Sequence, residues 1–438
     1  MTEISFASLP LPEAVRAGLA EAGFEHCTPI QAATLPIALA GRDVAGQART
    51  GTGKTAAFLL AIFKRLLEDP DPEAAGHHPR AIVIAPTREL AIQIHKDALQ
   101  LGRTTGLEFA LAYGGVDYQK QLDRLKGGVD VLIGTPGRVI DFFKQHVFGL
   151  KKIRIAVLDE ADRMFDLGFI SDIRYLFRAM PPPGERQTLM FSATFPLKVN
   201  ELAYEHMNDA ESVRIDQDHK TTERVEQVVY YPSNRDKLPL LVKLLNEMTD
   251  SHVMIFVNTR RAADRVDRML RGNGFDCAML AGSVPQKKRQ RLLERFHAGE
   301  LPILVATDVA ARGLHIPDVS HVINFDLPQD AADYVHRIGR TARLGARGRA
   351  ISFACEDYAF HLPEIEEFIG KPIALLDHDA EGLPALERAV PPTPASEEAR
   401  GGGRRGGGGN RGGDRGSNRG GRQRGGRRRS GGGGASSG

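Results

Sequence analysis

Hydrophobic positions fall into short continuous runs that alternate with stretches of helical periodicity. Between about residues 40 and 210, apolar runs at 81–85, 129–133, 155–158 and 188–191 each precede a turn and a helix-like pattern. A run without polar alternation is typical of a strand buried on both faces, and strands separated by helices form parallel sheets. This part of the chain therefore predicts a doubly wound α/β domain.

The same pattern restarts after a charged stretch at 217–226, with apolar runs at 253–257, 277–280, 303–305, 321–323 and 350–353. We therefore expect a second α/β domain in tandem with the first, and a boundary between residues 212 and 227. Ligands of such sheets bind beyond the carboxyl ends of the strands. Beyond about residue 376 the composition turns to proline, then glycine and arginine, which cannot bury apolar surface and predict disorder.

Composition and charge narrow the class of protein. The chain has 438 residues, enough for two domains and extra segments, and its net charge is +3. Residues 400–438 carry +10 and the rest −7, so binding to a polyanion by charge alone is expected of the tail or of local patches. The three cysteines, Cys27, Cys277 and Cys355, lack the spacing of a zinc site or disulfide framework. With no signal peptide or membrane-length apolar run, we expect a cytoplasmic protein.

A glycine-rich segment, residues 48–55, leads into the helical pattern of 56–67. Small residues let backbone N–H groups surround phosphate oxygens, and a helix N-terminus adds partial positive charge. We expect Lys54 to reach the β- and γ-phosphates of a nucleotide and Thr55 to ligate Mg²⁺. Because Ala48 replaces the first glycine of the P-loop pattern, a glycine-rich turn before a core helix stays the alternative. The predicted nucleotide-binding residues here are Ala48, Arg49, Thr50, Gly51, Thr52, Gly53, Lys54 and Thr55.

An acidic segment after the run at 155–158 strengthens this interpretation. Asp159 ends a predicted buried strand, where its carboxylate can hold Mg²⁺, partly through water, and Glu160 can orient or deprotonate the attacking water. An acidic surface turn is the alternative, but an acidic pair at the end of a buried strand downstream of a P-loop is much less common. Together the two segments predict an enzyme that hydrolyses a nucleoside triphosphate.

Residues 6–350 resemble the DEAD-box family of superfamily-2 helicases, because Asp159-Glu160-Ala161-Asp162 is accompanied by further family motifs in order. The resemblance implies an α/β fold of two tandem RecA-like domains with parallel sheets, ATP and Mg²⁺ as cofactors, and RNA as the partner. It places a Q-motif region at 1–33, an ATP-binding domain at 34–213, a linker at 214–226, a C-terminal helicase domain at 227–376 and a disordered Gly/Arg-rich tail at 377–438.

Residues 23–31 are similar to the family's Q motif, and Phe6 stands at the position of its upstream aromatic residue. The Gln31 amide can donate and accept hydrogen bonds at the adenine edge. The Phe6 ring can stack on the base. We therefore expect the enzyme to prefer ATP over GTP.

Short motifs at predicted strand ends or in loops resemble the RNA-contact motifs of the family. Such places offer hydroxyls, N–H groups and arginines to phosphates, although any one motif is compatible with a plain turn or helix cap. The resemblance assigns RNA contacts to Pro86, Thr87, Arg88, Gly114, Gly115, Thr135, Pro136, Gly137, Arg138, Asn258, Arg260, Gln286, Arg289 and Thr307.

Two motifs are expected to connect ATP hydrolysis with RNA binding. Ser192-Ala193-Thr194 resembles the coupling motif, whose hydroxyls can hydrogen-bond the acidic segment, and Asp162 and His336 join this set. In the last motif, Arg337 and Arg340 are three apart and are predicted to project from one helix face. They are expected to stabilise the γ-phosphate when the domains close. The predicted catalytic residues are Lys54, Asp159, Glu160, Arg337 and Arg340.

Three positions depart from the family pattern. Ala342 stands where glycine often follows Arg-Thr, and Ala281 precedes Gly282 where histidine is usual. His315 replaces an aspartate associated with the ATP ribose, which puts the sugar contact in doubt. The segment around His315, residues 353–358 and the basic tail resemble the branch of the family found in the bacterial RNA degradosome. That resemblance implies ribonuclease E and polynucleotide phosphorylase as partners.

Several alternatives stay open. One is an ATP-dependent RNA clamp or scaffold that does not unwind, and another is a DEAD-box helicase acting in ribosome assembly. A DNA translocase on the same architecture is disfavoured by Gln31 and the complete RNA-contact set. The tail is expected to tether RNA by charge, with a solubilising extension as the alternative; it lacks aromatic residues and cannot stack on bases.

Overall fold

A computed structural model of the chain describes residues 2–48, 51–70, 78–115, 117–215, 225–248, 251–280, 284, 286–311, 319–342 and 348–391. Arg49, Thr50, Ala281, His315 and the Gly/Arg-rich segment lie outside the described residues, as does the side chain of Gln286.

The first domain is built on a seven-stranded sheet whose strand order is β3-β4-β2-β5-β6-β1-β7, with every pairing parallel. The strands are β1 Val44–Gln47, β2 Ala81–Ile84, β3 Phe109–Ala112, β4 Val131–Gly134, β5 Ile155–Asp159, β6 Gln187–Ser192 and β7 Glu211–Arg214. The helices are η1 Phe6–Ser8, α1 Glu13–Glu21, α2 Pro29–Leu39, α3 Lys54–Glu68, α4 Arg88–Leu101, α5 Tyr118–Lys126, α6 Pro136–Lys144, α7 Ala161–Asp166, α8 Ile170–Ala179 and α9 Leu197–His206.

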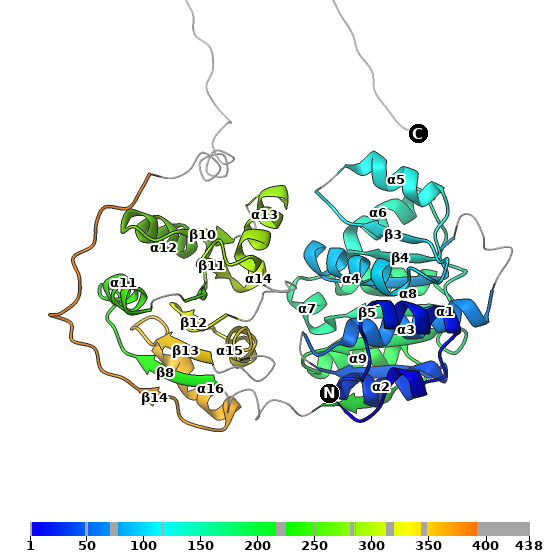
Figure 1. The fold of residues 1–438 in the computed structure, drawn as a ribbon, viewed down its shortest axis with the longest axis horizontal. Helices are drawn as coiled ribbons and strands as arrows, with labels where there is room; N and C mark the ends of the chain where they lie inside the picture. Colours follow the sequence, from blue (N-terminus) through cyan, green and yellow to red (C-terminus); the bar gives the residue numbers. More distant parts are fainter. Residues whose placement is uncertain are drawn as a thin grey trace, which may run out of the picture. The chain divides into compact units, whose positions relative to one another are not determined.

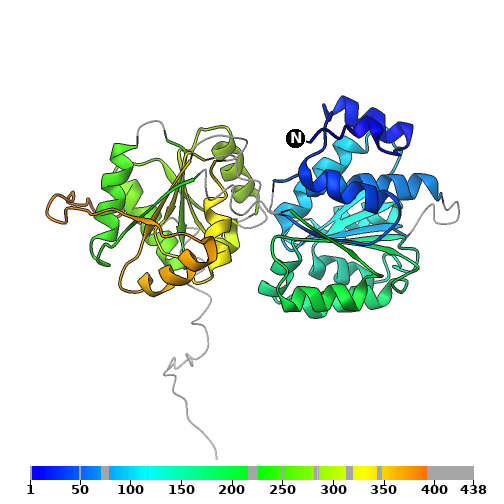
Figure 2. The same cartoon turned by 90° about the horizontal axis from the view of Figure 1, so that it is seen from below.

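Both faces of this sheet are covered, which explains the continuous apolar runs. Successive side chains of a strand point to opposite faces, and in β2 Val83 joins the apolar cluster of α1–α4 whereas Ile82 joins that of α6–α9. Figure 2 shows the strands between the blue helices on one side and the green helices on the other. The predicted parallel α/β architecture is confirmed here.

The second domain repeats the plan with strand order β10-β11-β9-β12-β13-β8-β14, again all parallel. The strands are β8 Val225–Tyr230, β9 Val253–Val257, β10 Cys277–Leu280, β11 Ile303–Thr307, β12 His321–Asn324, β13 Gly348–Phe353 and β14 Ala374–Leu375. The helices are α11 Lys237–Glu247, α12 Arg260–Gly272, α13 Gln286–His297, α14 Asp308–Ala311, α15 Ala331–Ile338, η3 Ala359–His361 and α16 Leu362–Ile369.

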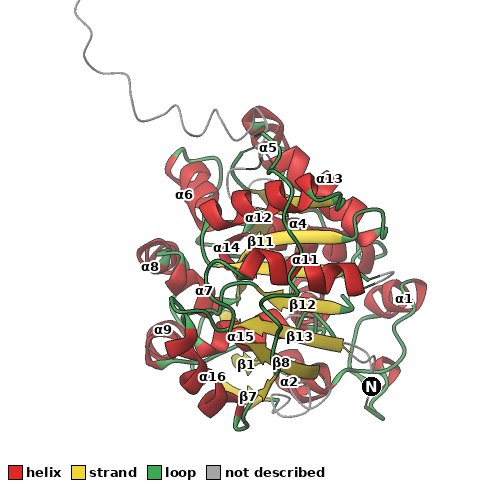
Figure 3. Ribbon diagram, turned by 90° about the vertical axis from the view of Figure 1, so that its left-hand side faces the viewer, coloured by secondary structure: helices red, strands yellow, loops and turns green. Residues whose placement is uncertain are grey.

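Two helix layers also enclose this second sheet (Figure 1). Ile255 of β9 packs in the cluster of α11 and α12, whereas its neighbours Met254 and Phe256 pack in the cluster of α13 and α14. Figure 3, coloured by secondary structure, shows strands such as β11, β12 and β13 in yellow and helices such as α11 and α12 in red. None of the described helices is long and apolar enough to cross a membrane.

The chain continues as an ordered strap, residues 377–391, beyond the predicted end of the second domain. Leu383 and Leu386 pack against the cluster of α11 and α12. The Arg268 Nε of α12 donates to the Val390 carbonyl at 2.7 Å, and the Val390 N–H donates back to the Arg268 carbonyl at 3.2 Å. Figure 1 shows the strap in orange, running from β14 to α12. The prediction of disorder from residue 377 is therefore wrong for residues 377–391.

Candidate nucleotide site and nucleic-acid interface

The glycine-rich segment lies between β1 and α3, and its residues 48 and 51–55 are described. The Ala48 N–H donates to the Ser192 carbonyl of the neighbouring strand at 3.0 Å. Gly51 and Gly53 have φ values of +85° and +94°, which glycine adopts without strain. A Cβ on Gly53 would lie 2.5 Å from the Gln31 Nε2. The backbone thus curves tightly before the N-terminus of α3, where Lys54 is the first helical residue.

Lys54 and Asp159 form the electrostatic centre of this region. Lys54 is 5% exposed, and its Nζ has no hydrogen-bond partner among the described residues. Its distance to the Asp159 Oδ1 is 3.7 Å, too long for a hydrogen bond. Burial raises the pKa of Asp159 to about 6; the Lys54 ammonium opposes this shift and the Glu160 carboxylate adds to it. A buried ammonium without a hydrogen-bond partner, at a helix N-terminus, fits a phosphate group.

Glu160 occupies a strained position between β5 and α7. Its φ and ψ are +53° and +54°, in the left-handed region that non-glycine residues rarely adopt. Its N–H donates to the Asp159 Oδ1 at 2.9 Å, and its Oε2 lies 3.4 Å from the Arg163 Nε. Such backbone strain, worth about 1–3 kcal/mol, concentrates at functional sites.

One cavity gathers the predicted nucleotide residues that lie on separate elements. It is lined by Gly51, Gly53, Lys54, Thr55, Asp159, Glu160 and Gln31, and also by Phe24, Leu90, Gln93, Asp97, Gln100 and Leu101. Thr55 and Asp159 are oxygen donors of the kind Mg²⁺ prefers, and Mg²⁺ commonly completes its shell with water and phosphate. Within the described ranges, no group of three acidic, histidine or cysteine side chains could hold a metal ion.

Gln31 is engaged with the protein itself. Its Oε1 accepts from the Thr28 N–H at 2.8 Å, in a capping box that begins α2, and its Nε2 donates to the Gly53 carbonyl at 3.0 Å. The amide therefore ties the Q-motif region to the P-loop. Adenine recognition by Gln31 stays a prediction.

Phe6 does not line the cavity. It is 2% exposed, and its ring packs edge-on against Phe24 with centroids 5.9 Å apart. Phe24 is 36% exposed and is the aromatic ring that lines the cavity. Stacking of a base on Phe6, as predicted, would need Phe6 to leave this packing. Phe24 was missed as a cavity residue although it belongs to the same Q-motif stretch.

Asp97 is a second cavity residue that the sequence did not single out. It lies on α4, and burial raises the pKa of its carboxyl to about 6, with the Lys96 ammonium opposing the shift. The available signal was an acidic residue nine positions after Arg88, a predicted RNA-contact residue on the same helix, and such a spacing is too common to be informative.

The coupling motif contacts the acidic segment as expected. The Asp162 N–H donates to the Ser192 Oγ at 3.0 Å. The Thr194 N–H and Oγ1 both donate to the Asp162 Oδ2, each at 3.0 Å. The Ala193 carbonyl accepts from the Gln47 Nε2 at 3.3 Å, next to the P-loop. The motif therefore joins β6, the P-loop strand and α7 through hydrogen bonds.

The predicted RNA-contact residues of the first domain meet along one sheet edge. They follow β2, β3 and β4, which are neighbours in the sheet, and the edge is the carboxyl end of each strand. Thr87 caps α4 by accepting from the Leu90 N–H at 3.3 Å. A Cβ on Gly115 would lie 2.3 Å from the Arg88 Nη1, so the diglycine leaves room for this arginine. The residues on this edge are Pro86, Thr87, Arg88, Gly114, Gly115, Thr135, Pro136, Gly137 and Arg138.

Two helices begin at this edge, α4 and α6. Helix N-termini bind phosphate through free N–H groups and the helix dipole. Arg138, in the first turn of α6, stacks over the rings of Tyr118 and Phe142 at 5.1 and 5.4 Å. The arrangement can hold the backbone of a nucleic acid.

The second domain offers a comparable edge, at the ends of neighbouring strands β9, β10 and β11. Arg260 is exposed at the start of α12, and Thr307 ends β11. Asn258 is anchored instead: its Nδ2 donates to the Leu327 carbonyl and its Oδ1 accepts from the Arg337 Nη2, both at 2.8 Å. The Arg289 Nη2 donates to the Ala310 carbonyl at 2.6 Å.

Arg337 is held by residues of its own domain, and its predicted contact with the γ-phosphate would require it to leave them. Its side chain is 1% exposed, and its five N–H groups donate to both carboxylate oxygens of Asp308, to the Asn258 and Asn324 side chains and to the Asp326 carbonyl. These internal contacts engage the whole guanidinium group, so it has no donor left for a phosphate. Helix α15 ends at Ile338, so Arg340 does not share a helix face with Arg337. Arg340 itself is 6% exposed.

Two other positions of the last motif, His336 and Ala342, lie among the described residues. His336 lies on α15, with its Nδ1 3.8 Å from the Asp333 Oδ1. Ala342 has a φ of +56°, in the left-handed region, which accounts for the glycine that is usual at this position.

Comparisons with known sequences identify both domains. The profile of the DEAD/DEAH box helicase family matches residues 28–202, and that of the helicase conserved C-terminal domain matches residues 236–345. A protein of Vibrio campbellii, the ATP-dependent RNA helicase RhlB, is 56% identical over 384 residues, which are 87% of this chain and 88% of the relative. RhlB of Xanthomonas oryzae is 57% identical over 401 residues, covering 91% of this chain and 70% of the relative.

Solved structures agree with these sequence matches. Saccharomyces cerevisiae Dbp5 bound to RNA and ADP BeF3 superposes with a TM-score of 0.74 at 33% identity, covering 86% of this chain and 96% of that protein. Mss116p bound to single-stranded RNA and AMP-PNP gives a TM-score of 0.76 at 30% identity, covering 86% and 80%.

Proposed function

The chain belongs to the DEAD-box family of ATP-dependent RNA helicases, in the group of RhlB-like proteins, and from this premise we propose how its residues perform that activity. It is an ATP-hydrolysing RNA helicase. One observation carries the proposal most directly: the buried Lys54 ammonium has no hydrogen-bond partner among the described residues and begins a helix next to Asp159. Both features suit a bound triphosphate.

In this proposal, Lys54 holds the β- and γ-phosphates, and the N–H groups of residues 51–55 surround them. Thr55 and Asp159 would hold Mg²⁺, which would supply charge neutralisation at the transferred phosphoryl group. Glu160 orients the attacking water and accepts its proton. Arg340 stabilises the developing negative charge when ATP and RNA bring the two domains together.

RNA is held through its sugar-phosphate backbone, so recognition is largely independent of sequence. The N-termini of α4 and α6 and the exposed Arg260 support this interpretation, because they supply N–H donors and positive charge. Thr194 hydrogen-bonds Asp162 of the acidic segment, and in this proposal the pair couples the state of the nucleotide site to RNA binding. Bending of the bound strand would then expel its complement locally.

The cellular role we favour is RNA degradation in the cytoplasm, with ribonuclease E and polynucleotide phosphorylase. The RhlB-like sequence supports this choice of branch. A protein partner is also supported by exposed aromatic side chains in the second domain, Phe360 at 69% and Phe368 at 53%. Ribosome assembly is the other candidate pathway. Proteins that co-purify with the tagged chain would separate the two: ribonuclease E supports degradation, and ribosomal proteins without it support assembly.

The ATPase assignment is tested by comparing the wild type with Lys54→Ala. Wild-type ATPase should rise with single-stranded RNA and far less with DNA of the same sequence. Lys54→Ala should lose about 10³-fold or more of the RNA-stimulated rate, since a preorganised phosphate contact of this kind contributes several kcal/mol. Normal RNA-stimulated turnover in Lys54→Ala would refute the site. Equal stimulation by DNA would favour a translocase on DNA.

A further inference from the structure

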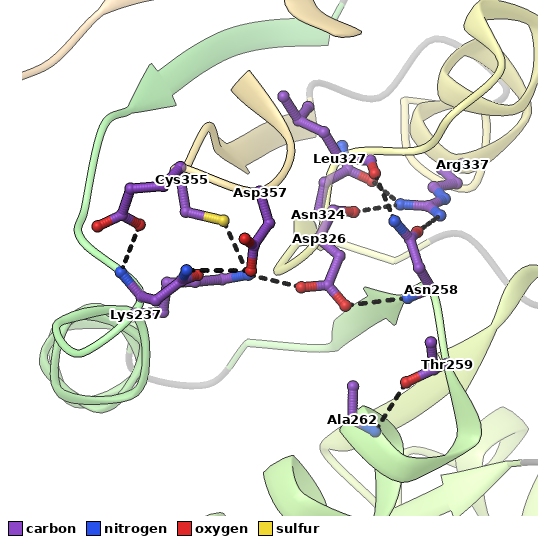
Figure 4. Close-up of polar contacts among 12 residues, drawn as sticks. Lys237, Asn258, Thr259, Ala262, Asn324, Asp326, Leu327, Arg337, Cys355 and Asp357 are labelled. Atoms are coloured by element: carbon purple, nitrogen blue, oxygen red, sulfur yellow. Dashed lines mark hydrogen bonds and ion pairs between the residues drawn. The ribbon is translucent and has the colours of Figure 1, made fainter. Parts of the chain in front are cut away.

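A buried charged network lies beneath the proposed RNA-contact loop of the second domain (Figure 4). It contains two cations, Lys237 and Arg337, and two acids, Asp326 and Asp308. Asn258 follows β9 directly and contacts both halves of the network: its N–H donates to Asp326, and its Oδ1 accepts from Arg337 (Figure 4). Arg337 belongs to the last motif of the family, whereas Lys237 lies on α11, outside the motifs of the family.

The Lys237 ammonium is buried among a carboxylate, a thiol and two aromatic rings. Lys237 is 4% exposed, and its Nζ donates to the Asp326 Oδ1 at 2.5 Å. The Cys355 Sγ lies 3.5 Å from the same Nζ, and the rings of Phe325 and Tyr358 lie 4.4 and 5.3 Å from it.

Stability alone does not explain this lysine. It is the first residue of α11, where the helix dipole disfavours a cation. Desolvating a buried ion pair costs about as much as the pair returns, so apolar residues could fill the same space without loss. A buried pair of this kind is better explained by the geometry that it fixes.

The geometry fixed here is that of the loop after β9. The second oxygen of Asp326, Oδ2, accepts from the Asn258 N–H at 3.0 Å. The Asn258 side chain is held by Leu327 and Arg337. Two residues later the loop presents the exposed Arg260, after Thr259 has capped α12 by accepting from the Ala262 N–H at 3.1 Å. The path from Lys237 to Arg260 therefore runs through one carboxylate and one N–H group.

We propose that Lys237 is a positioning residue for RNA binding: by holding the Asp326 carboxylate, it fixes the loop 258–260 so that Arg260 meets the RNA backbone. This inference rests on the proposed function, in which Arg260 contacts RNA. Lys237 touches neither RNA nor nucleotide. Its loss should therefore weaken RNA binding while leaving the first-domain ATP cavity intact.

The test uses the full chain with Lys237→Met, which keeps the length of the side chain and removes its charge. RNA-stimulated ATPase gives two quantities: the concentration of polyadenylate RNA that half-saturates the rate, and KM for ATP at saturating RNA. We expect the first to rise about tenfold, as for a lost hydrogen bond between charged groups. KM for ATP should change less than about twofold. Lys243→Met, on the same helix and with no role assigned to it, should match the wild type.

Two further variants keep the outcomes distinct. If Arg260→Ala leaves the half-saturating RNA concentration unchanged, the proposed RNA contact fails. If Arg260→Ala raises it and a folded Lys237→Met does not, only the positioning role fails. Should Lys237→Met not fold, Lys237→Met/Asp326→Asn removes the unpaired charge. Its amide is a weaker acceptor for the Asn258 N–H, so a rise of about threefold or more is expected. A wild-type value would overturn the proposal.

Discussion

Arg337 and Arg340 are three positions apart in the sequence, but they lie in different surroundings. We therefore expect them to have different roles. Arg337 joins Asp308, Asn258 and the Asp326 backbone in one buried cluster. Arg340 follows the end of α15. The spacing of two arginines in a sequence indicates a shared helix face only while the helix continues.

The two arginines should therefore give opposite phenotypes. Arg337→Met leaves Asp308 without its buried partner and should lower the free energy of unfolding by about 3–5 kcal/mol. Arg340→Ala should reduce RNA-stimulated kcat by about 10³-fold and destabilise the fold less than Arg337→Met. Urea unfolding and steady-state ATPase measure the two effects, with the exposed Arg265→Met as the control for both. An Arg337→Met variant that unfolds like the wild type but has a reduced kcat would support the predicted contact of Arg337 with the γ-phosphate.

Asp97 offers a test that depends on pH. Its folded pKa, about 6, lies above the ordinary value of 3.8 because burial disfavours the carboxylate. Protonation of Asp97 thus stabilises the fold; this contribution is complete below pH 4 and is lost as pH rises through 6. Asp97→Asn is neutral at every pH. At pH 7.5 the free energy of unfolding of Asp97→Asn should be about 1–2 kcal/mol higher than that of the wild type. This value is smaller than the full pKa shift implies, because Asp97 is partly exposed and solvent screens its charge.

The difference between Asp97→Asn and the wild type should shrink as the pH falls from 7.5 to 4. Thermal unfolding across this range measures it. Asp123→Asn, at an exposed position on α5, serves as the control and should show no comparable trend. A constant difference at all pH values would mean that Asp97 titrates normally.

At the scale of elements, strands with uninterrupted apolar residues were predictable and the others were not. β9 is apolar throughout and was predicted at its full length, 253–257. β1 contains Gly46 and Gln47 and gives no such signal, although it carries the P-loop. β14 has only two residues, both exposed, and is defined by its pairing with β8. Pairing between distant segments is not encoded in local periodicity.

The residues of the site also differ in how far the sequence predicts them. Lys54 and Asp159 each stand at a junction between a strand and a helix, where the local sequence reveals their chemistry. Lys237 and Asp326 are separated by 89 positions and meet only in the folded domain. The burial of Phe6 under Phe24 is also a tertiary contact. Motifs therefore revealed which segments form the site, and packing decided which side chains line it.

The strap at residues 377–391 should contribute to the stability of the second domain. Its leucines, Leu383 and Leu386, are partly buried on the apolar cluster of α11 and α12. Replacing both with Asp should lower the free energy of unfolding by about 2–4 kcal/mol, because apolar burial is lost and charge is placed on that cluster. Thermal unfolding measures the change. Truncation after Pro391 is the matched control and should leave the unfolding midpoint near that of the wild type.

At the scale of the whole molecule, charge is divided between a mildly acidic body and a strongly basic tail. Removing residues 400–438 takes away a charge of +10. RNA affinity should then fall more at 50 mM salt than at 200 mM salt, because the tail's phosphate contacts release counterions. Fluorescence anisotropy with a labelled single-stranded RNA measures both values. An unchanged affinity at low salt would leave the tail without a tethering role.

The central claim is that ATP hydrolysis at Lys54, Asp159 and Glu160 drives local unwinding of RNA. Displacement of a labelled strand from a short RNA duplex tests it most directly, with wild type and Glu160→Gln compared at saturating ATP. The wild type should release the strand over repeated turnovers, while Glu160→Gln binds ATP and RNA but releases at most one strand per enzyme. A wild type that hydrolyses ATP on RNA without displacing the strand would contradict the account and favour an ATP-dependent clamp.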